Sequence, residues 1–424
     1  RTETWWPMVG PFLRYQARCQ HLLQEGRFAG DFLCFAGDEV PNSGEPETDI
    51  RGGYDWDACN RELLTRLKVK GGRLVVPGGA DYAALVLPTN RLIASASRRE
   101  IERLRQAGAR IVTAVGDLAL EPDFTCADAA LHVRFLHRRY ADGTDGYFVA
   151  YPGTNAVSAD CSFRIKGRFP QVWDAESGAR YRARNWRTEG GRTRVTLDFK
   201  PCGSWFVMFA EKEDASLRLE PCARTTGERA VNGPWTLSFP EGWRCPRSVT
   251  LEKLKSWTDI SEGEVKYFSG IATYETRVDG AGLGAAGERV WLDLGRVKNL
   301  AEVTVNGRTY PALWRPPFRV DITDALKAGA QTLDVRIRVA NLWPNRLIGD
   351  AQLPEDCEWN GDNSLKAIPD WVRTGGSSPH GRLTFTTWRH WKKDAQLLES
   401  GLLGPVRVTI ESTCKTMTKG EASE

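Results

Sequence analysis

The hydrophobic pattern over residues 28–121 alternates between the spacing of strands and that of helices. The apolar runs have the length of short buried strands, and they lie at Asp31–Gly37, Leu74–Val76, Ala83–Pro88 and Arg110–Val115. Strands that alternate with helices favour a mostly parallel sheet packed against helices. This segment therefore predicts an α/β layer fold.

Two helices are predicted within this segment. Asp55 is placed to cap the first, whose apolar stripe consists of Trp56, Cys59, Leu63, Leu64 and Leu67. The second is predicted to begin at a capping box, Ser97–Glu100, and to end at Gly108.

After residue 121 the spacing changes to period two, which is typical of half-buried strands. Turn signals stand at Asp142-Gly143 and Ser177-Gly178, and Glu211–Asp214 is a charged stretch that fits a linker. The strand candidates are Leu131–His137, Tyr147–Tyr151, Ser162–Ile165, Thr193–Phe199 and Ser204–Phe209. Together these features predict a small antiparallel β module.

A second β-rich unit is predicted from about residue 230 to residue 412. Its strands include Val290–Leu294, Ala301–Val305 and Leu333–Val339, and an Asn306-Gly307 turn follows the second of them. A unit of this size with such strands favours a two-sheet sandwich or a jelly roll.

The predicted fold class is therefore multidomain, α/β plus all-β. Residues 1–22 have helical spacing but are too few for a domain, and we expect them to end a domain that lies upstream. The α/β module is predicted at 23–121, the small β-sandwich module at 122–215 and the larger sandwich at 225–412. Residues 413–424 are polar and are predicted to form a frayed tail.

The composition is that of a globular protein with several cores. The chain has 424 residues, of which 41% are hydrophobic and 26% are charged, and this length predicts two to four domains. A net charge of +4 on so large a surface argues against a dedicated nucleic-acid binder. Because no run of about 18 apolar residues occurs, we predict no membrane span. The chain starts at Arg1 without a leader, so we expect a processed chain or a fragment.

No motif for a metal or a cofactor stands out. The ten cysteines form no CxxC pair and the five histidines are scattered, which excludes the usual zinc spacings. Walker, HExxH and GxSxG motifs are missing from the sequence. The first strand runs into Gly37-Asp38-Glu39, whose carboxylates would repel a dinucleotide pyrophosphate. We therefore predict no cofactor and no metal.

Asp38 and Glu39 nevertheless follow the carboxyl end of a predicted strand, where ligands bind in α/β sheets. Glycosidases use a pair of carboxyl groups, so Glu39 is a candidate catalytic residue, with Asp55 and Asp57 nearby in the sequence. The interpretation that we favour is structural: Asp55 and Asp57 as helix caps and Asp38 as a turn residue.

Sugar recognition offers a second set of candidates. The sequence holds 16 Trp, ten of them after residue 216, and such rings fill β-rich cores or lie against sugars. Asn341–Asp350 is predicted to be a loop dense in ring, amide, Arg and Asp groups. The candidate sugar-binding residues are Asn341, Trp343, Asn345, Arg346 and Asp350, with Trp314 from an earlier aromatic run. In the alternative interpretation the polar groups only hold the loop, and Trp343 fills the core.

An ordered set of short motifs carries a family resemblance. They are Thr4–Trp6, Tyr15–Gln20, Tyr267–Gly270, Val303–Gly307, Pro317–Thr323, Asn341–Asp350 and Ser400–Val406. Three of them, Val303–Gly307, Pro317–Thr323 and Asn341–Asp350, resemble the sugar-binding jelly roll of family 2-type glycoside hydrolases. The whole set resembles the C-terminal half of glycoside hydrolase family 106, the α-L-rhamnosidases.

This resemblance implies a fold and an activity. It implies a Rossmann-like, amidotransferase-like α/β module and a galactose-binding-like jelly roll, both after a catalytic (β/α) barrel that supplies two glutamates. It also implies hydrolysis of terminal α-L-rhamnosyl residues with inversion, in the periplasm or outside the cell. We therefore expect the accessory half of such an enzyme, with a rhamnose-containing glycan as its partner. The alternatives are a non-catalytic carbohydrate-binding protein and a structural scaffold.

Overall fold

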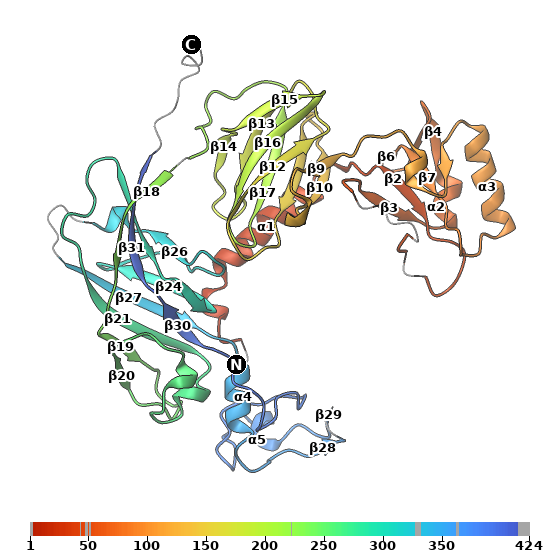
Figure 1. Cartoon of the computed structure of the whole chain (residues 1–424). Coiled ribbons are helices and arrows are strands. Elements are labelled where there is room, and N and C mark those ends of the chain that lie inside the picture. Colours follow the sequence, from red (N-terminus) through yellow and green to blue (C-terminus); the bar gives the residue numbers. More distant parts are fainter. Residues whose placement is uncertain are drawn as a thin grey trace. The chain divides into compact units, whose positions relative to one another are not determined.

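The computed structural model describes residues 3–42, 44–46, 50, 52–221, 223–326, 332–361 and 364–413. The tail predicted at 413–424 lies outside this part of the chain, apart from the backbone of Thr413. The chain divides into two compact units, which are described separately below: Tyr15–Glu220, and Arg1–Arg14 together with Pro221–Glu424 (Figure 1). The predicted domain boundaries stay predictions.

Helical structure at the start of the chain agrees with the spacing of residues 1–22. A 3-10 turn, η1 (Trp6–Met8), precedes the helix α1 (Gly10–Gln24). The buried Cys19 of α1 belongs to a small cluster with Phe206 and Met208, which anchors this half of the helix.

The α/β part of the Tyr15–Glu220 unit contains a parallel sheet in the order β3-β2-β7-β8. Its strands are β2 (Phe32–Phe35), β3 (Trp56–Cys59), β7 (Ala84–Val86) and β8 (Ile111–Val112). The helices are α2 (Arg61–Arg66) and α3 (Ser95–Gln106), with the 3-10 turn η2 (Val115–Asp117). A small antiparallel sheet holds β4 (Lys68–Lys70), β5 (Arg73–Val75) and β6 (Asp81–Tyr82). The mostly parallel sheet predicted from the alternating pattern is therefore present.

Two predicted helix starts are wrong. Asp55 caps no helix, because the next residues form β3 and α2 begins only at Arg61. Asn60 caps α2 instead, its Oδ1 accepting a hydrogen bond from the Leu63 N–H at 3.0 Å. Ser97 does not begin α3; it lies inside the helix, where it is buried and bonded to another part of the chain. Local spacing did not distinguish a cap from a tertiary contact.

A β-sandwich completes this unit. One sheet has the order β1-β10-β11-β17-β13-β14: β1 (Arg27–Phe28), β10 (Arg134–Arg139), β11 (Asp145–Ala150), β17 (Ser204–Ala210), β13 (Phe169–Trp173) and β14 (Arg180–Arg182). The other has the order β15-β16-β12-β9: β15 (Trp186–Glu189), β16 (Arg192–Phe199), β12 (Val157–Phe163) and β9 (Phe124–Cys126), with η3 (Ala129–Leu131) after β9. Inward side chains such as Tyr147, Val195 and Phe209 are fully buried, as period-two spacing requires.

A second β-sandwich forms the main part of the other unit. One sheet has the order β18-β31-β22-β26: β18 (Ala223–Ala230), β31 (Arg407–Thr413), β22 (Glu288–Asp293) and β26 (Arg319–Asp321). The other has the order β20-β19-β21-β27-β24-β25: β20 (Ser248–Leu251), β19 (Trp235–Ser238), β21 (Ile271–Asp279), β27 (Thr332–Ala340), β24 (Leu300–Val305) and β25 (Arg308–Thr309). Asn306 and Gly307 both have positive φ, at 49° and 82°, and they form the predicted turn between β24 and β25.

Smaller elements surround this sandwich and its core. They are η4 (Trp257–Asp259), η5 (Val265–Tyr267), η6 (Thr323–Ala325) and the ribbon of β23 (Arg296–Lys298) with β30 (Gly401–Gly404). The core contains Trp235, Trp257 and Tyr274, so part of the Trp content is explained by packing.

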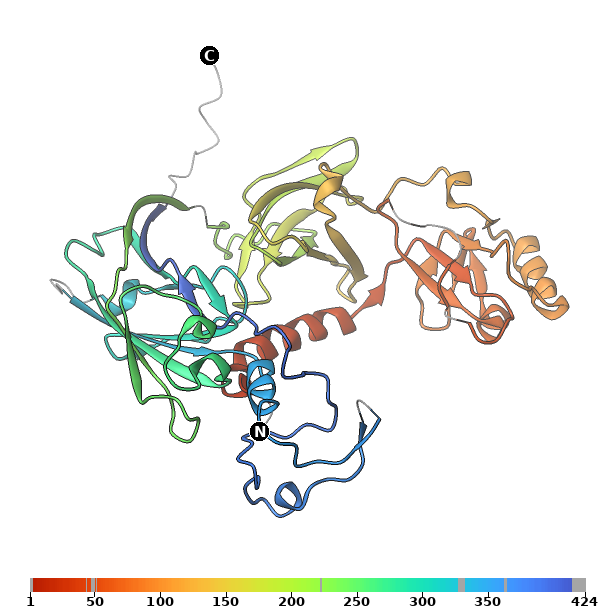
Figure 2. The ribbon, with the colours of Figure 1, turned by 60° about the horizontal axis from the view of Figure 1, so that its bottom comes forward.

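A long insertion leaves the sandwich after β27. It starts with α4 (Pro344–Asp350) and continues through β28 (Trp359–Asn360), β29 (Ser364–Leu365) and α5 (Asp370–Arg373) before it returns to β30. Figure 2 shows it as a set of long loops beside α4. We call residues 351–397 the extension.

Candidate functional site

The predicted Asn341–Asp350 loop is in part a helix. Pro344 stands in the first turn of α4, where its fixed φ fits a helix and its missing N–H is not needed. The prediction of a loop over the whole range is therefore wrong. Helical spacing places Arg346 and Asp350 one turn apart, on the same face.

Asn341 and Asn345 hold the backbone on both sides of the extension. Asn341 donates to the Phe268 carbonyl at 2.9 Å, and its side-chain oxygen accepts from the Gly270 N–H at 2.9 Å. Asn345 donates to the Leu398 carbonyl and accepts from the Leu398 N–H, both at 2.7 Å. Each side chain is 1% exposed. These amides close the base of the extension.

Arg346 is a buried cation with two carboxylate partners. Its Nη1 lies 2.8 Å from Glu264 Oε2, and its Nη2 lies 3.0 Å from Asp350 Oδ1, while its own side chain is 1% exposed. Burial alone would raise the pKa of Glu264, but hydrogen bonds and charge from Arg346 and Arg244 outweigh it and hold that pKa below its usual value. The guanidinium is thus neutralised inside the protein.

Asp350 joins α4 to the far side of the extension. Its Oδ2 accepts from the Leu383 N–H at 3.1 Å, the Thr384 N–H at 2.8 Å and the Thr384 hydroxyl at 2.6 Å. Its Oδ1 lies 3.0 Å from Arg346 Nη2 as an ion pair but accepts no hydrogen bond within the described residues. Asp350 is therefore a structural clamp as well as a lining residue of the cleft described next.

A cleft of about 650 Å³ opens between α4 and the extension. Its lining combines rings with charges, and the rings are Trp359, Trp371, Phe385 and Trp391. Such a mixture is typical of sites that bind sugars, because rings face the apolar side of a sugar while polar groups bond to its hydroxyls. The indole N–H groups of Trp359 and Trp371 are covered and have no acceptor within the described residues. The indole N–H groups of Trp291 and Trp343, outside the cleft, are in the same state, so these donors do not by themselves indicate a ligand.

Ion pairs fix the charged wall of this cleft. Arg382 contacts Glu355 Oε1 at 3.2 Å and Asp356 Oδ1 at 3.3 Å, and Arg389 contacts Glu355 Oε2 at 3.4 Å. Ser378 donates to the second oxygen of Asp356 at 2.5 Å. Arg382 also donates to the Pro354 and Leu353 carbonyls, both at 3.2 Å, so its planar guanidinium group is held in one position beside the cleft.

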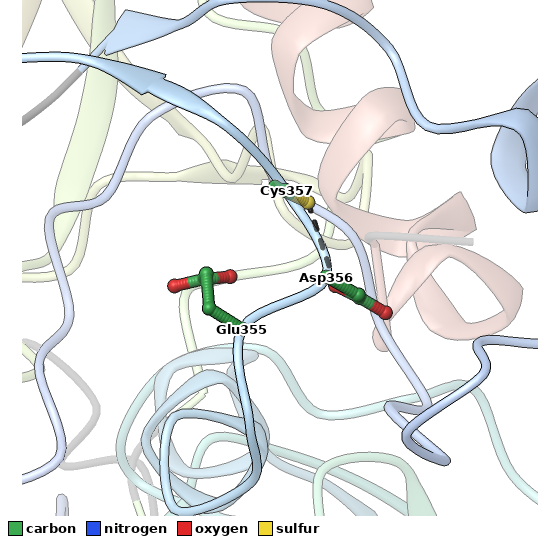
Figure 3. A group of neighbouring side chains, drawn as sticks. All are labelled: Glu355, Asp356 and Cys357. Carbon is green, nitrogen blue, oxygen red and sulfur yellow. Dashed lines mark hydrogen bonds between the residues drawn. The ribbon is translucent and has the colours of Figure 1, made fainter.

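Glu355, Asp356 and Cys357 lie close enough together to suggest a metal site. Figure 3 shows Cys357 beside Asp356, with the Glu355 carboxylate on the other side of the chain. The carboxylates already have arginine partners, and burial raises the pKa of the Cys357 thiol to about 12, so it stays protonated near neutral pH. The arrangement favours an ion-pair network over a bound cation.

The two Trp candidates lie outside this cleft. Trp343 is half-buried and contacts Trp243 edge to face at 6.3 Å. Trp314 is half-buried, with Phe12 edge to face at 5.1 Å and the Arg315 guanidinium 5.5 Å from its ring centre. The structure thus brings Asn341, Asn345, Arg346 and Asp350 together around α4. That any of the six candidates touches a sugar stays a prediction.

Glu39 lies in the other unit, in the loop that follows β2. It is exposed, and its Oε1 accepts from the Leu92 N–H at 2.9 Å. The neighbouring Asp38 accepts from the Ala94 N–H and the Ser97 hydroxyl, both at 2.9 Å, so it fills the N-terminal end of α3. Both line an open hollow at the carboxyl ends of β2 and β3. A catalytic role for Glu39 stays a prediction.

The other acidic candidates bond within their own module, and neither caps a helix. Asp55 accepts from the Trp56 N–H at 2.9 Å, and burial raises its pKa to about 6. Asp57 accepts from the Tyr82 hydroxyl. Both carboxylates serve the α/β core through contacts that sequence spacing did not reveal.

The cleft residues of the extension were missed from the sequence. The signal present was the density of Trp after residue 216, but it did not separate core rings such as Trp257 from cleft rings such as Trp371 and Trp391. Within the described residues, no helix has the length and apolar character needed to cross a membrane.

Comparison with known proteins finds similarity to glycoside hydrolases. The family model described as alpha-L-rhamnosidase, glycoside hydrolase family 106, matches residues 1–116 and 108–186. The structure of a rhamnosidase from Novosphingobium sp. PP1Y is 30% identical, with a TM-score of 0.76, over 97% of this chain and 42% of that one. The first 186 residues of this chain thus match glycoside hydrolase family 106, and nearly the whole chain is similar to a rhamnosidase.

A curated relative carries a different name. The "Putative beta-glucuronidase" of Formosa agariphila is 42% identical over 97% of this chain and 58% of its own length. The chain thus spans about half the length of the relatives it matches. The resemblance seen in the sequence motifs is confirmed, and with it the assignment to glycoside hydrolases.

Proposed function

We propose that this chain is the accessory, carbohydrate-binding part of a glycoside hydrolase that removes terminal α-L-rhamnosyl residues from polysaccharides. The cleft of the extension carries the proposal, because its rings and fixed arginines suit a sugar. The similarity to a rhamnosidase over 97% of this chain supports rhamnose as the sugar.

The finer architecture belongs to the same proposal. The parallel order β3-β2-β7-β8 with α2 and α3 supports a Rossmann-like, amidotransferase-like module, and the two sheets after residue 223 support a galactose-binding-like jelly roll. Residues 1–22 would then end a catalytic barrel, followed by modules at 23–121, 122–215 and 225–412.

A structural scaffold is the second candidate, and one observation favours it for part of the site. Asn341, Asn345 and Arg346 are each 1% exposed and bond only to protein groups within the described residues. In our proposal these residues hold the cleft, and the rings of the extension face the sugar.

Isothermal titration of the 424-residue chain with rhamnose-containing oligosaccharides tests the proposal. We expect Trp391→Ala and Trp371→Ala each to weaken binding about tenfold, because each removes a wall of the cleft. Trp186→Ala is the matched control, since Trp186 is exposed on β15 in the other unit.

Two outcomes would overturn this function. If the wild-type chain binds no rhamnose-containing glycan at millimolar concentration, the chain is a scaffold. If it hydrolyses an aryl α-L-rhamnoside by itself, the accessory role gives way to a catalytic one.

A further inference from the structure

The mouth of the cleft carries a run of aromatic and basic residues, Trp388-Arg389-His390-Trp391-Lys392-Lys393. We call it the rim segment. Arg389, Trp391, Lys392 and Lys393 line the cleft directly.

Neighbouring rings of the rim segment contact one another, one pair tilted and the other edge to face. The Trp388 and His390 rings are 5.5 Å apart, and the His390 and Trp391 rings are 5.0 Å apart. Trp388 is 59% exposed, although a large apolar ring is normally buried. Trp391 lines the cleft, and His390 and Trp388 extend its aromatic surface beyond the cleft lining.

The charges at this mouth are unbalanced. Every carboxylate oxygen of Glu355 and Asp356 already faces Arg382, Arg389 or Ser378. Lys392 and Lys393, in contrast, are exposed and have no ion-pair partner within the described residues. Asp394 follows them in the sequence, but no ion pair joins its carboxylate to either ammonium group. Within the described residues, the mouth therefore presents two unpaired lysines against one unpaired carboxylate, Asp394, a surplus of one positive charge next to an aromatic surface.

We propose that the cleft takes an acidic glycan: a rhamnosyl unit between the rings, and a carboxylate or sulfate ester of the adjoining sugar at Lys392 and Lys393. This inference rests on the proposed function, since it adds a charge requirement to the same site. Aromatic surface and positive charge in one strip match a sugar that carries an anionic group.

Matched ligands test the charge requirement on the 424-residue chain. The probes are a rhamnosyl-glucuronic acid disaccharide, its methyl ester, and a monosulfated rhamnosyl-glucose disaccharide, titrated at 50 mM and 500 mM NaCl. We expect the free acid to bind roughly five- to tenfold more tightly than the ester at low salt, and the difference to shrink at high salt. The sulfated probe shows whether carboxylate or sulfate is preferred.

Substitutions at the rim segment show which residues cause the preference for the acid over the ester. Lys392→Gln with Lys393→Gln should lower the ratio of the affinities for acid and ester from about five- to tenfold to near one. Lys253→Gln with Lys255→Gln is the control, because these lysines are exposed elsewhere in the same unit. Trp391→Ala should weaken acid and ester alike.

Three results would overturn the inference. Equal affinity of the chain for the acid and the ester would overturn the inference but leave the proposed sugar binding intact. Equally tight binding of heparin or single-stranded DNA, insensitive to Trp391→Ala, would show a general cation surface. If no rhamnoside binds at all, the proposed function fails together with this inference.

Discussion

The variant Asp350→Asn distinguishes a structural role of Asp350 from a direct role in sugar binding. The carboxylate accepts three hydrogen bonds from Leu383 and Thr384 and pairs with Arg346, and its side chain is 3% exposed. An amide oxygen can keep part of the first set, but the amide nitrogen then faces the guanidinium, donor against donor. The change therefore removes one partner of a buried ion pair.

The loss of stability in this variant depends on the partners that Arg346 keeps. Losing one partner of a buried pair costs about 3–5 kcal/mol when the other charge is left uncompensated. Arg346 Nη1 still has its ion pair with Glu264 Oε2 at 2.8 Å, so we expect a cost at the lower end of this range, about 3 kcal/mol. A unit of this size shifts its melting temperature by roughly 2–4 °C per kcal/mol, which predicts a fall of about 6–12 °C.

Calorimetry and tryptophan fluorescence would measure the melting temperature, and titration would measure sugar affinity at a temperature where the variant is folded. Asp394→Asn is the control, since Asp394 lines the same cleft but is exposed and has no ion-pair partner in the described part of the chain. A melting temperature within about 2 °C of wild type, with sugar binding lost, would refute the clamp and make Asp350 a sugar ligand.

The remaining predictions concern the Tyr15–Glu220 unit. Burial alone would lower the pKa of His137, but its hydrogen bonds to Asp123 at 2.8 Å and Asp145 at 3.0 Å outweigh burial and raise it. The folded state then binds the proton more tightly than the unfolded one, so this stabilisation is complete below about pH 6.5 and is lost as pH rises through the folded pKa. Melting temperatures of this unit should therefore fall as the pH rises above about 6.5, and a flat profile would contradict the charged His137. If the proposed function holds, Glu39→Gln in a full-length enzyme should leave kcat for an aryl α-L-rhamnoside unchanged, because an amide oxygen also accepts from the Leu92 N–H. A loss of about a hundredfold or more in kcat would instead make Glu39 an acid or base of the reaction.

The sequence alone predicted several of the longer strands. Period-two runs predicted β11, β16, β17, β24 and β27, because a sheet with one buried face leaves a local alternation along each strand. The Asn306-Gly307 turn was equally local, since few residues accept two consecutive positive φ values. The family was also visible in the sequence, because it depends on the order of motifs along the chain.

Tertiary structure decided what the polar residues do. Asp38 and Asp350 look alike in the sequence as carboxylates near a turn, yet one fills the end of α3 and the other clamps Thr384, 34 residues further on. A buried carboxylate needs partners from whichever segment packs against it, and no local pattern records which segment that is. The cleft follows the same logic. Trp371 and Trp391 become its walls only because Asp350 holds Thr384, inside the extension, and Asn345 holds Leu398, just after it, against α4. Trp257, the same residue type, is buried inside the sandwich.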